Sequence, residues 1–111
     1  MALALALDIR RATNRFPRRG YGELKSQLIS AAESVAHTIV EGCGAVSQEE
    51  FARFLEMAIK SNMELEGELL MVRAYRLLST ADLDALESRT IDVRKSVISL
   101  RKKVIASILD G

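Results

Sequence analysis

The chain has 111 residues, of which 49% are hydrophobic, and its 16 Lys and Arg residues nearly balance its 15 Asp and Glu residues. A chain of this length is the size of one domain, and with two Tyr, three Phe and no Trp its core must be aliphatic. The net charge of +1 excludes the strong overall field of a highly basic protein, and the single cysteine, Cys43, excludes an internal disulfide framework and fits a reducing cytoplasm.

The first expected helix covers about residues 2–15. The apolar run 1–7 lacks a basic leader and is interrupted by Asp8 and Arg10, so it is too short to span a membrane and is a poor signal peptide. Four apolar residues recur at helical spacing: Leu5, Ile9, Ala12 and Phe16. We therefore expect the first turns of a buried helix and no association with a membrane.

The second expected helix covers about residues 21–42, after a loop that contains Pro17 and Gly20. One face of this helix is apolar and consists of Leu24, Leu28, Ala31, Val35 and Ile39. Gly42 and Gly44 follow, and we expect positive φ angles there because glycines with that conformation commonly end helices.

The third expected helix runs from Ser47 to about Leu77, and Ser47 with Glu50 forms a capping-box pattern. Its apolar stripe consists of Phe51, Phe54, Leu55, Ala58, Leu65, Leu69 and Val72. Gly67 interrupts this helix at a cost of about 1 kcal/mol relative to Ala, which suggests that a neighbouring helix approaches closely there.

The fourth expected helix begins after a cap at Ser79 or Thr80 and continues to about Leu109. The turn before it is only a few residues long, so helices three and four must pack antiparallel. The sequence therefore predicts an all-α fold, an up-and-down four-helix bundle that occupies residues 1–111.

Helix four has more apolar surface than one seam requires. Its expected core positions are Leu83, Leu86, Thr90, Val93, Val97, Leu100 and Val104. A second row, Ile91, Ile98 and Ile105, is offset from these positions around the helix axis. The row is either part of a wide core face or a contact with another subunit, and the second interpretation makes these three residues a candidate oligomer interface.

The sequence contains few residue groups of the kind that catalysis or metal binding requires. His37 and Cys43 are six residues apart, so they point in different directions from one helix and cannot share a metal ion. Glu64 and Glu68 share a helix face, but carboxylate pairs of this kind are common on solvated helices. We expect no cofactor, no metal and no enzymatic activity, and we expect His37 to be buried or half-buried.

Three stretches together resemble the four-helix-bundle proteins encoded in intervening sequences of bacterial 23S ribosomal RNA genes. They are residues 15–28 (RFPRRGYGELKSQL), residues 31–42 (AAESVAHTIVEG), and residues 47–55 (SQEEFARFL) continuing into 58–66 (AIKSNMELE). The resemblance covers about residues 7–78. The chain departs from the family pattern at Ala36, Thr38 and Lys60, where that pattern has Pro, Asn and Gly.

The resemblance implies a four-helix subunit that assembles as a ring-like homo-oligomer, a homopentamer, without enzymatic activity. It also implies kinship with the accessory variability protein of diversity-generating retroelements, and hence RNA or DNA and a reverse transcriptase or other protein as candidate partners. Four residues match positions that the family pattern favours, and we interpret them as packing and hydrogen-bonding positions: Glu41, Ser61, Glu64 and Glu66.

Charge is segregated along the chain. Residues 8–25 carry six cations against two anions and residues 73–103 carry eight against four, whereas residues 41–68 carry two cations against seven anions. The candidate nucleic-acid-binding residues are Arg10, Arg11, Arg15, Arg18, Arg19, Lys25, Arg94, Lys95, Arg101, Lys102 and Lys103. Either they form a basic rim that repeats around a ring and grips phosphates, or they are solvated residues that pair between helices. The two functions that follow are a nucleic-acid-associated or adaptor module and a protein-interaction scaffold that binds no nucleic acid.

Overall fold

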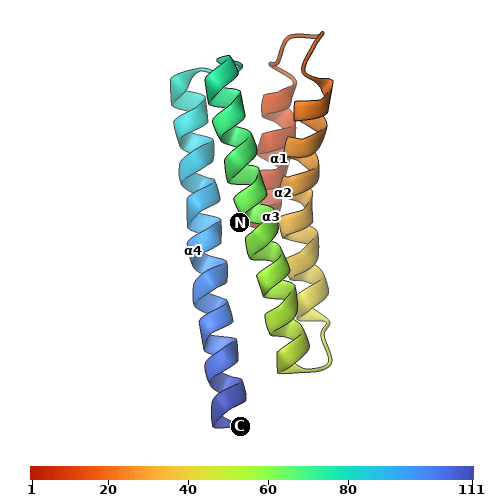
Figure 1. The fold of residues 1–111 in the computed structure, drawn as a ribbon, viewed down its shortest axis with the longest axis vertical. Coiled ribbons are helices and arrows are strands. Elements are labelled where there is room, and N and C mark those ends of the chain that lie inside the picture. Colours follow the sequence, from red (N-terminus) through yellow and green to blue (C-terminus); the bar gives the residue numbers. More distant parts are fainter.

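A computed structural model describes all residues from Met1 to Gly111 and contains four α-helices and no strand (Figure 1). The helices are α1 (Ala2–Thr13), α2 (Gly22–Cys43), α3 (Gln48–Tyr75) and α4 (Thr80–Asp110). The predicted all-α class and the four-helix bundle are therefore confirmed. No helix combines the length and the low charge that crossing a lipid bilayer requires.

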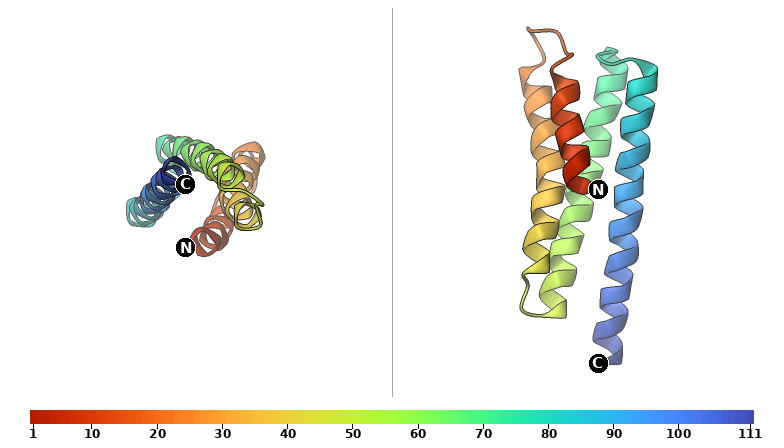
Figure 2. Two further views of the ribbon diagram at one scale, coloured as in Figure 1. Left: turned by 90° about the horizontal axis from the view of Figure 1, so that it is seen from below. Right: turned by 180° about the vertical axis from the view of Figure 1, so that it is seen from behind.

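The four helices run alternately up and down (Figures 1 and 2). Each helix packs on the next helix along the chain, and α1 also lies beside α4, while the backbones of the diagonal pairs, α1 with α3 and α2 with α4, do not approach each other. The α1–α2 pair and the α3–α4 pair are therefore opposite walls of the bundle. The loop between α1 and α2 and the turn between α3 and α4 lie at the same end of the molecule, which we call the upper end (Figure 1).

Side-chain caps fix the starts of α3 and α4. The Ser47 hydroxyl accepts a hydrogen bond from the Glu50 amide at 3.1 Å, and the Ser79 hydroxyl accepts one from the Asp82 amide at 3.1 Å. The Glu50 carboxylate lies 3.4 Å from the amide of Val46, one residue before the position expected in a capping box. Both predicted starts are confirmed, and each cap satisfies an amide that the helix itself leaves unpaired.

The core is aliphatic and follows the predicted periodicity. Twenty buried hydrophobic side chains form one cluster, and Phe16 is its only aromatic member. The four residues predicted at helical spacing in the first helix are all buried, although α1 ends at Thr13 and Phe16 lies beyond it in the loop. In α4 six of the seven predicted core residues are buried. Two polar side chains, Asn62 and Thr90, are also fully buried, and the Asn62 amide nitrogen donates a hydrogen bond to the Thr90 carbonyl at 2.9 Å.

Leu100 departs from the predicted core of α4, because 40% of its surface is exposed. The reason is the length of α1, which has 12 residues against 31 in α4 and so covers only about 18 Å of its length. Figure 2 shows the N-terminus of α1 about halfway along the bundle. Leu100 lies beyond that point, in a shallow hollow that Met1, Ile39 and Val97 also line.

Gly44 caps the end of α2 as expected, but the positive φ angles expected at Gly42 and Gly44 and the close packing expected at Gly67 are wrong. Gly44 ends α2 with φ of −93°, and the only glycine with positive φ is Gly20. The amides of Gly44 and Ala45 bond to carbonyls three residues back, and such tight turns need no left-handed residue. Close helix packing occurs at Gly42, where a Cβ would lie 3.0 Å from the Cβ of Phe54, and not at Gly67, where it would meet nothing within 4 Å.

Candidate nucleic-acid and assembly surfaces

Five of the eleven candidate basic residues form ion pairs within the chain. The pairs are Arg10–Glu33 at 2.9 Å, Arg11–Asp8 at 3.3 Å, Arg15–Asp82 at 2.6 Å, Arg94–Glu66 at 2.9 Å and Arg101–Glu56 at 3.6 Å. The other six have no carboxylate within ion-pair distance: Arg18, Arg19, Lys25, Lys95, Lys102 and Lys103. The sequence could not show this pairing, because most of the partners are far apart along the chain.

The unpaired basic residues are divided between regions far apart on the bundle. Arg18 and Arg19 lie in the loop at the upper end, whereas Lys102 and Lys103 lie near the other end of α4 (Figure 1). Lys102 is 22 residues along α4 from Thr80, which corresponds to about 33 Å. Lys95 lies about midway along α4, so within one subunit the unpaired basic residues are spread along the bundle and do not form one continuous rim.

The upper end also holds a third unpaired arginine, Arg76, which was not among the candidate residues predicted from the sequence. Arg76 directly follows α3 in the left-handed conformation, with φ of 56°, and it is exposed without a carboxylate partner. The rings of Tyr21, just before α2, and Tyr75, at the end of α3, have centroids 5.7 Å apart, so the start of α2 and the end of α3 are in contact here. We call Arg18, Arg19 and Arg76, with this tyrosine pair, the upper basic cluster.

Arg73 lies one turn below this cluster and has a different environment. Its guanidinium donates hydrogen bonds to Glu87 at 2.9 Å and to Asp84 at 2.7 Å. These bonds, first to Glu87 and then to Asp84, raise the pKa of Arg73 above its usual range. Its charge is thus neutralised within the α3–α4 pair, whereas that of Arg76 is not.

The predicted interface residues of α4 are partly covered by their own subunit. Ile91, Ile98 and Ile105 are all half-buried, and Ile105 packs against the core. None of the three belongs to the strongly exposed apolar side chains, which are instead found at Leu3, Leu7 and Val40 in α1 and α2, at Met63 and Leu70 in α3, and at several other positions.

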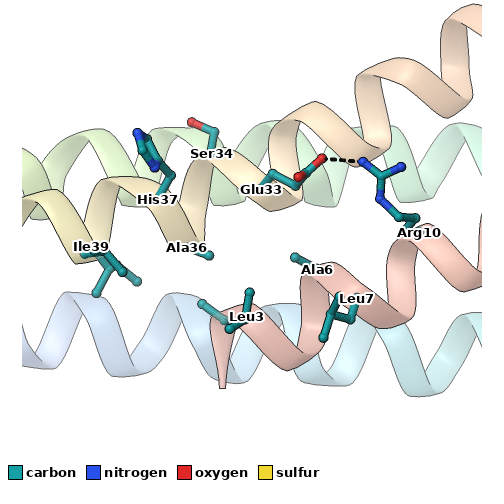
Figure 3. A pocket seen from close by; sticks show the side chains of 11 residues that line it. Leu3, Ala6, Leu7, Arg10, Glu33, Ser34, Ala36, His37 and Ile39 are labelled. Carbon is teal, nitrogen blue, oxygen red and sulfur yellow. Dashed lines mark hydrogen bonds and ion pairs between the residues drawn. The ribbon is translucent and has the colours of Figure 1, made fainter.

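An open groove lies between α1 and α2, and we call it the α1–α2 groove. Its volume is about 760 Å³, and its walls include Leu3, Ala6 and Leu7 from α1 and Ala36 and Val40 from α2. Figure 3 shows the side chains of Leu3 and Ala6 on one side and Ala36 on the other, with the Arg10–Glu33 ion pair farther along. Seven of its eleven lining residues are hydrophobic, so the groove is suited to an apolar group.

His37 stands at the rim of this groove with a side chain that is 76% exposed, so the expectation of a buried or half-buried histidine is wrong. Its Nε2 atom lies 2.9 Å from Oε1 of Glu41, one helical turn farther along α2. Glu41 has no Arg or Lys partner, and His37 is the one basic side chain within ion-pair distance of its carboxylate.

A polar groove lies between α2 and α3. Ser26 and Ser30 line it from α2 and Glu64 and Glu68 from α3, so the two carboxylates predicted to share a helix face do so. Partial burial, followed by the charges of Glu64 and Glu23, raises the pKa of Glu68. No group of three potential ligand side chains in the chain is placed to hold a metal ion.

A comparison with known protein families gives one decisive match. The family model described as 23S rRNA-intervening sequence protein matches residues 1–99. The chain belongs to this family. No curated protein sequence matches the chain.

A solved structure has the same fold as this member of the 23S rRNA-intervening sequence protein family. This chain is similar to a protein of unknown function from the S23 ribosomal protein family of Bacteroides thetaiotaomicron VPI-5482, with 19% identity and a TM-score of 0.82. The alignment covers 91% of this chain and 94% of that one. At this level of identity the likeness establishes the shared fold.

Two of the positions that the 23S rRNA-intervening sequence pattern favours form contacts between helices. The hydroxyl of Ser61 in α3 lies 2.9 Å from that of Ser34 in α2. Glu66 accepts hydrogen bonds from Arg94 Nε at 2.9 and 3.2 Å and lies 3.3 Å from the Asn62 amide nitrogen. These residues join helices, as their interpretation as hydrogen-bonding positions predicted.

Proposed function

We propose that this protein is a non-catalytic, self-assembling helical bundle that holds the phosphate backbone of RNA or DNA with the upper basic cluster. One observation carries the proposal. Arg18, Arg19 and Arg76 lack carboxylate partners and share one end of the bundle with the Tyr21–Tyr75 pair, whereas Arg15 and Arg73 in the same region are paired. Unpaired guanidinium groups bind phosphates, and exposed aromatic rings can stack on bases.

Assembly would strengthen a site that is weak in one subunit. Three cations per copy give modest affinity, but a ring that repeats the cluster presents all copies to one strand at a high effective concentration. The resemblance to pentameric bundles favours five copies, and the exposed apolar side chains of α1, α2 and α3 provide surface for contacts between them. Lys102 and Lys103 would form a second, weaker basic region at the other end.

The alternative is a scaffold that binds only proteins, with a reverse transcriptase among the candidate partners. Two observations favour this scaffold. The net charge is only +1, and five of the candidate basic residues are already paired within the chain: Arg10, Arg11, Arg15, Arg94 and Arg101. In this alternative the cations stabilise contacts between helices, and the upper basic cluster is an ordinary solvated surface.

The proposal is tested by replacing all three arginines of the upper basic cluster with Ala. We expect the variant to keep its helicity and oligomeric mass while its affinity for fluorescently labelled RNA or DNA falls by about tenfold or more. The slope of log affinity against log salt should also become shallower, by about one for each phosphate that the protein no longer neutralises. Fluorescence anisotropy between about 50 and 200 mM salt measures both quantities, since this range gives large changes.

The matched control is the double variant Lys102→Ala with Lys103→Ala, which removes cations from the other end of the bundle. It should bind nearly as well as the wild type. A control that loses as much affinity as the cluster variant would contradict the assignment to the upper end. A wild type that binds no single- or double-stranded RNA or DNA at low salt would put the scaffold in first place.

A further inference from the structure

The outer side of the α3–α4 pair carries apolar residues around an ion pair. Arg94 Nε donates to Oε2 of Glu66 at 2.9 Å, so these two residues mark where the antiparallel helices face each other. Side chains three or four residues away lie on the same side of a helix. Met63 and Leu70 therefore flank Glu66, and Ile91 and Ile98 flank Arg94. We call these four apolar residues the α3–α4 face.

The α3–α4 face is only partly covered within the subunit. Met63 is 59% exposed and Leu70 is 62% exposed, and the two isoleucines of the face are half-buried. On the opposite wall of the bundle the α1–α2 groove is also uncovered, with Leu3 66% and Val40 70% exposed. One molecule thus has a partly exposed apolar face on one wall and an apolar groove on the other.

We infer that the α3–α4 face of one copy packs into the α1–α2 groove of the next copy, so that each contact joins two different surfaces. This inference rests on the assembly part of the proposed function and names the surfaces that would make it. A contact of this kind is heterologous: it leaves one groove and one face free in every partial assembly. Repetition then produces a closed ring when the rotation between copies closes, and a filament when it does not.

The charges around the two surfaces favour this pairing. Lys95 and Lys102 lie on α4 next to Ile91 and Ile98, at spacings of four, and neither has a carboxylate partner. Beside the groove, Glu41 lies one helical turn from the lining residue His37, which is its only basic neighbour within ion-pair distance. Packing a face into a groove brings these lysines toward the Glu41 carboxylate, which has no Lys or Arg partner in its own copy, while packing two faces together would bring the lysines of both copies to one interface.

The test uses two variants that each damage one surface. Leu3→Arg places a charge in the groove and leaves the face intact, whereas Met63→Arg places a charge on the face and leaves the groove intact. Because an unpaired charge is costly to bury, each variant alone should fall to the 12.3 kDa subunit mass in sedimentation velocity. Val46→Arg is the matched control, since Val46 is 94% exposed in the α2–α3 loop, and it should assemble like the wild type.

Mixing the two variants gives the decisive measurement. The intact face of Leu3→Arg fits the intact groove of Met63→Arg, so an equimolar mixture should form a 1:1 dimer with twice the subunit mass and nothing larger. A mixture that remains monomeric, or a variant that assembles normally, overturns the inference. Val40→Arg with Leu70→Arg repeats the experiment on the same two surfaces, and far-UV circular dichroism verifies that every variant is folded.

Sedimentation of the wild type distinguishes a failure of the face-to-groove contact from a failure of self-assembly as a whole. A wild type that sediments as a monomer removes both. A wild type that assembles while the mixture shows no complementation leaves self-assembly in place and refutes only the face-to-groove contact. Nucleic-acid binding by the upper basic cluster is measured independently of either result.

Discussion

Helices α3 and α4 are joined along their length by polar contacts, whereas α1 lies on α2 with an apolar groove open between them. On the α3–α4 side, Arg73 bonds to two carboxylates of α4, and Asn62 and Glu66 contact α4 at mid-height. On the α1–α2 side, the one ion pair between the helices, Arg10–Glu33, is more than half exposed on both partners.

The two walls differ in how firmly the position of one helix on the other is specified. A buried polar group is costly unless it is paired, so Asn62 and Thr90 penalise every register of α3 against α4 that separates them. No comparable group fixes α1 on α2, and α1 is too short to cover the lower half of the bundle. The loosely specified wall is also the one that offers apolar surface to another molecule.

The largest expected effect comes from Asn62→Asp. The new carboxylate would be fully buried against the Thr90 carbonyl and the carboxylate of Glu66, so we expect a loss of about 3–5 kcal/mol in the free energy of unfolding at pH 7. Urea denaturation followed by circular dichroism measures the loss.

The control for this substitution is Asn62→Leu, which has a similar volume and carries no polar group. It should cost less than about 2 kcal/mol, because it also removes the Oδ1 atom of Asn62, which has no hydrogen-bond partner. Equal stability of the two variants would show that the site is accessible to water and that the polar contact does not define the register.

A smaller effect is expected for the coupling energies of two ion pairs, one on each wall of the bundle. Arg94 and Glu66 are 31% and 25% exposed, and Arg10 and Glu33 are 57% and 54% exposed. Double-mutant cycles with Ala should give a coupling energy of about 1–2 kcal/mol for the first pair, because charged hydrogen bonds strengthen as water is excluded. The second coupling should be below about 0.5 kcal/mol and should vanish in about 1 M salt. Couplings of equal size would remove the contrast between the walls.

The smallest effect concerns pH. The pKa of Glu68 is raised above its ordinary value of 4.5, chiefly by partial burial and then by Glu64 and Glu23. Folding therefore opposes ionisation, so the contribution of this group to stability is fully present below pH 4.5 and is lost as pH rises through the folded-state pKa. Glu68→Gln should be more stable than the wild type at pH 7, by less than about 0.5 kcal/mol after solvent screening.

The advantage of Glu68→Gln should disappear in thermal unfolding below about pH 4, where the wild-type carboxyl is already protonated in both states. Added salt at pH 7 should reduce the advantage, since part of it comes from repulsion by neighbouring carboxylates. An advantage that is independent of pH would point to packing instead of charge.

Most of the fold could be predicted because its determinants are local. The caps at Ser47 and Ser79 and the helical spacing of Leu5, Ile9 and Ala12 are visible in short windows of sequence, and the structure confirms them. The exposure of Leu3 and Leu7 could not be predicted in the same way, because it depends on which side of α1 the other helices cover.

The surfaces were harder to predict because they depend on partners far along the chain. Nothing near Arg94 indicates that Glu66, 28 residues earlier, neutralises it, and nothing near Arg76 indicates that it remains unpaired. The two glycines show the same limit. Gly42 and Gly67 both interrupt helical sequence, and only the three-dimensional packing reveals that the phenylalanines of α3 approach the first and nothing approaches the second.

The contact between α1 and α4 has a consequence for synthesis of the chain. Three of the four helix–helix contacts join consecutive helices. Contacts between residues close in sequence favour rapid folding. The fourth depends on residues such as Asp8 and Arg89, which are 81 positions apart and form an ion pair. Helix α1 leaves the ribosome before α4, so the side of α1 that faces α4 is covered only after α4 has been made. Until then the apolar side chains of α1 are more open to premature association.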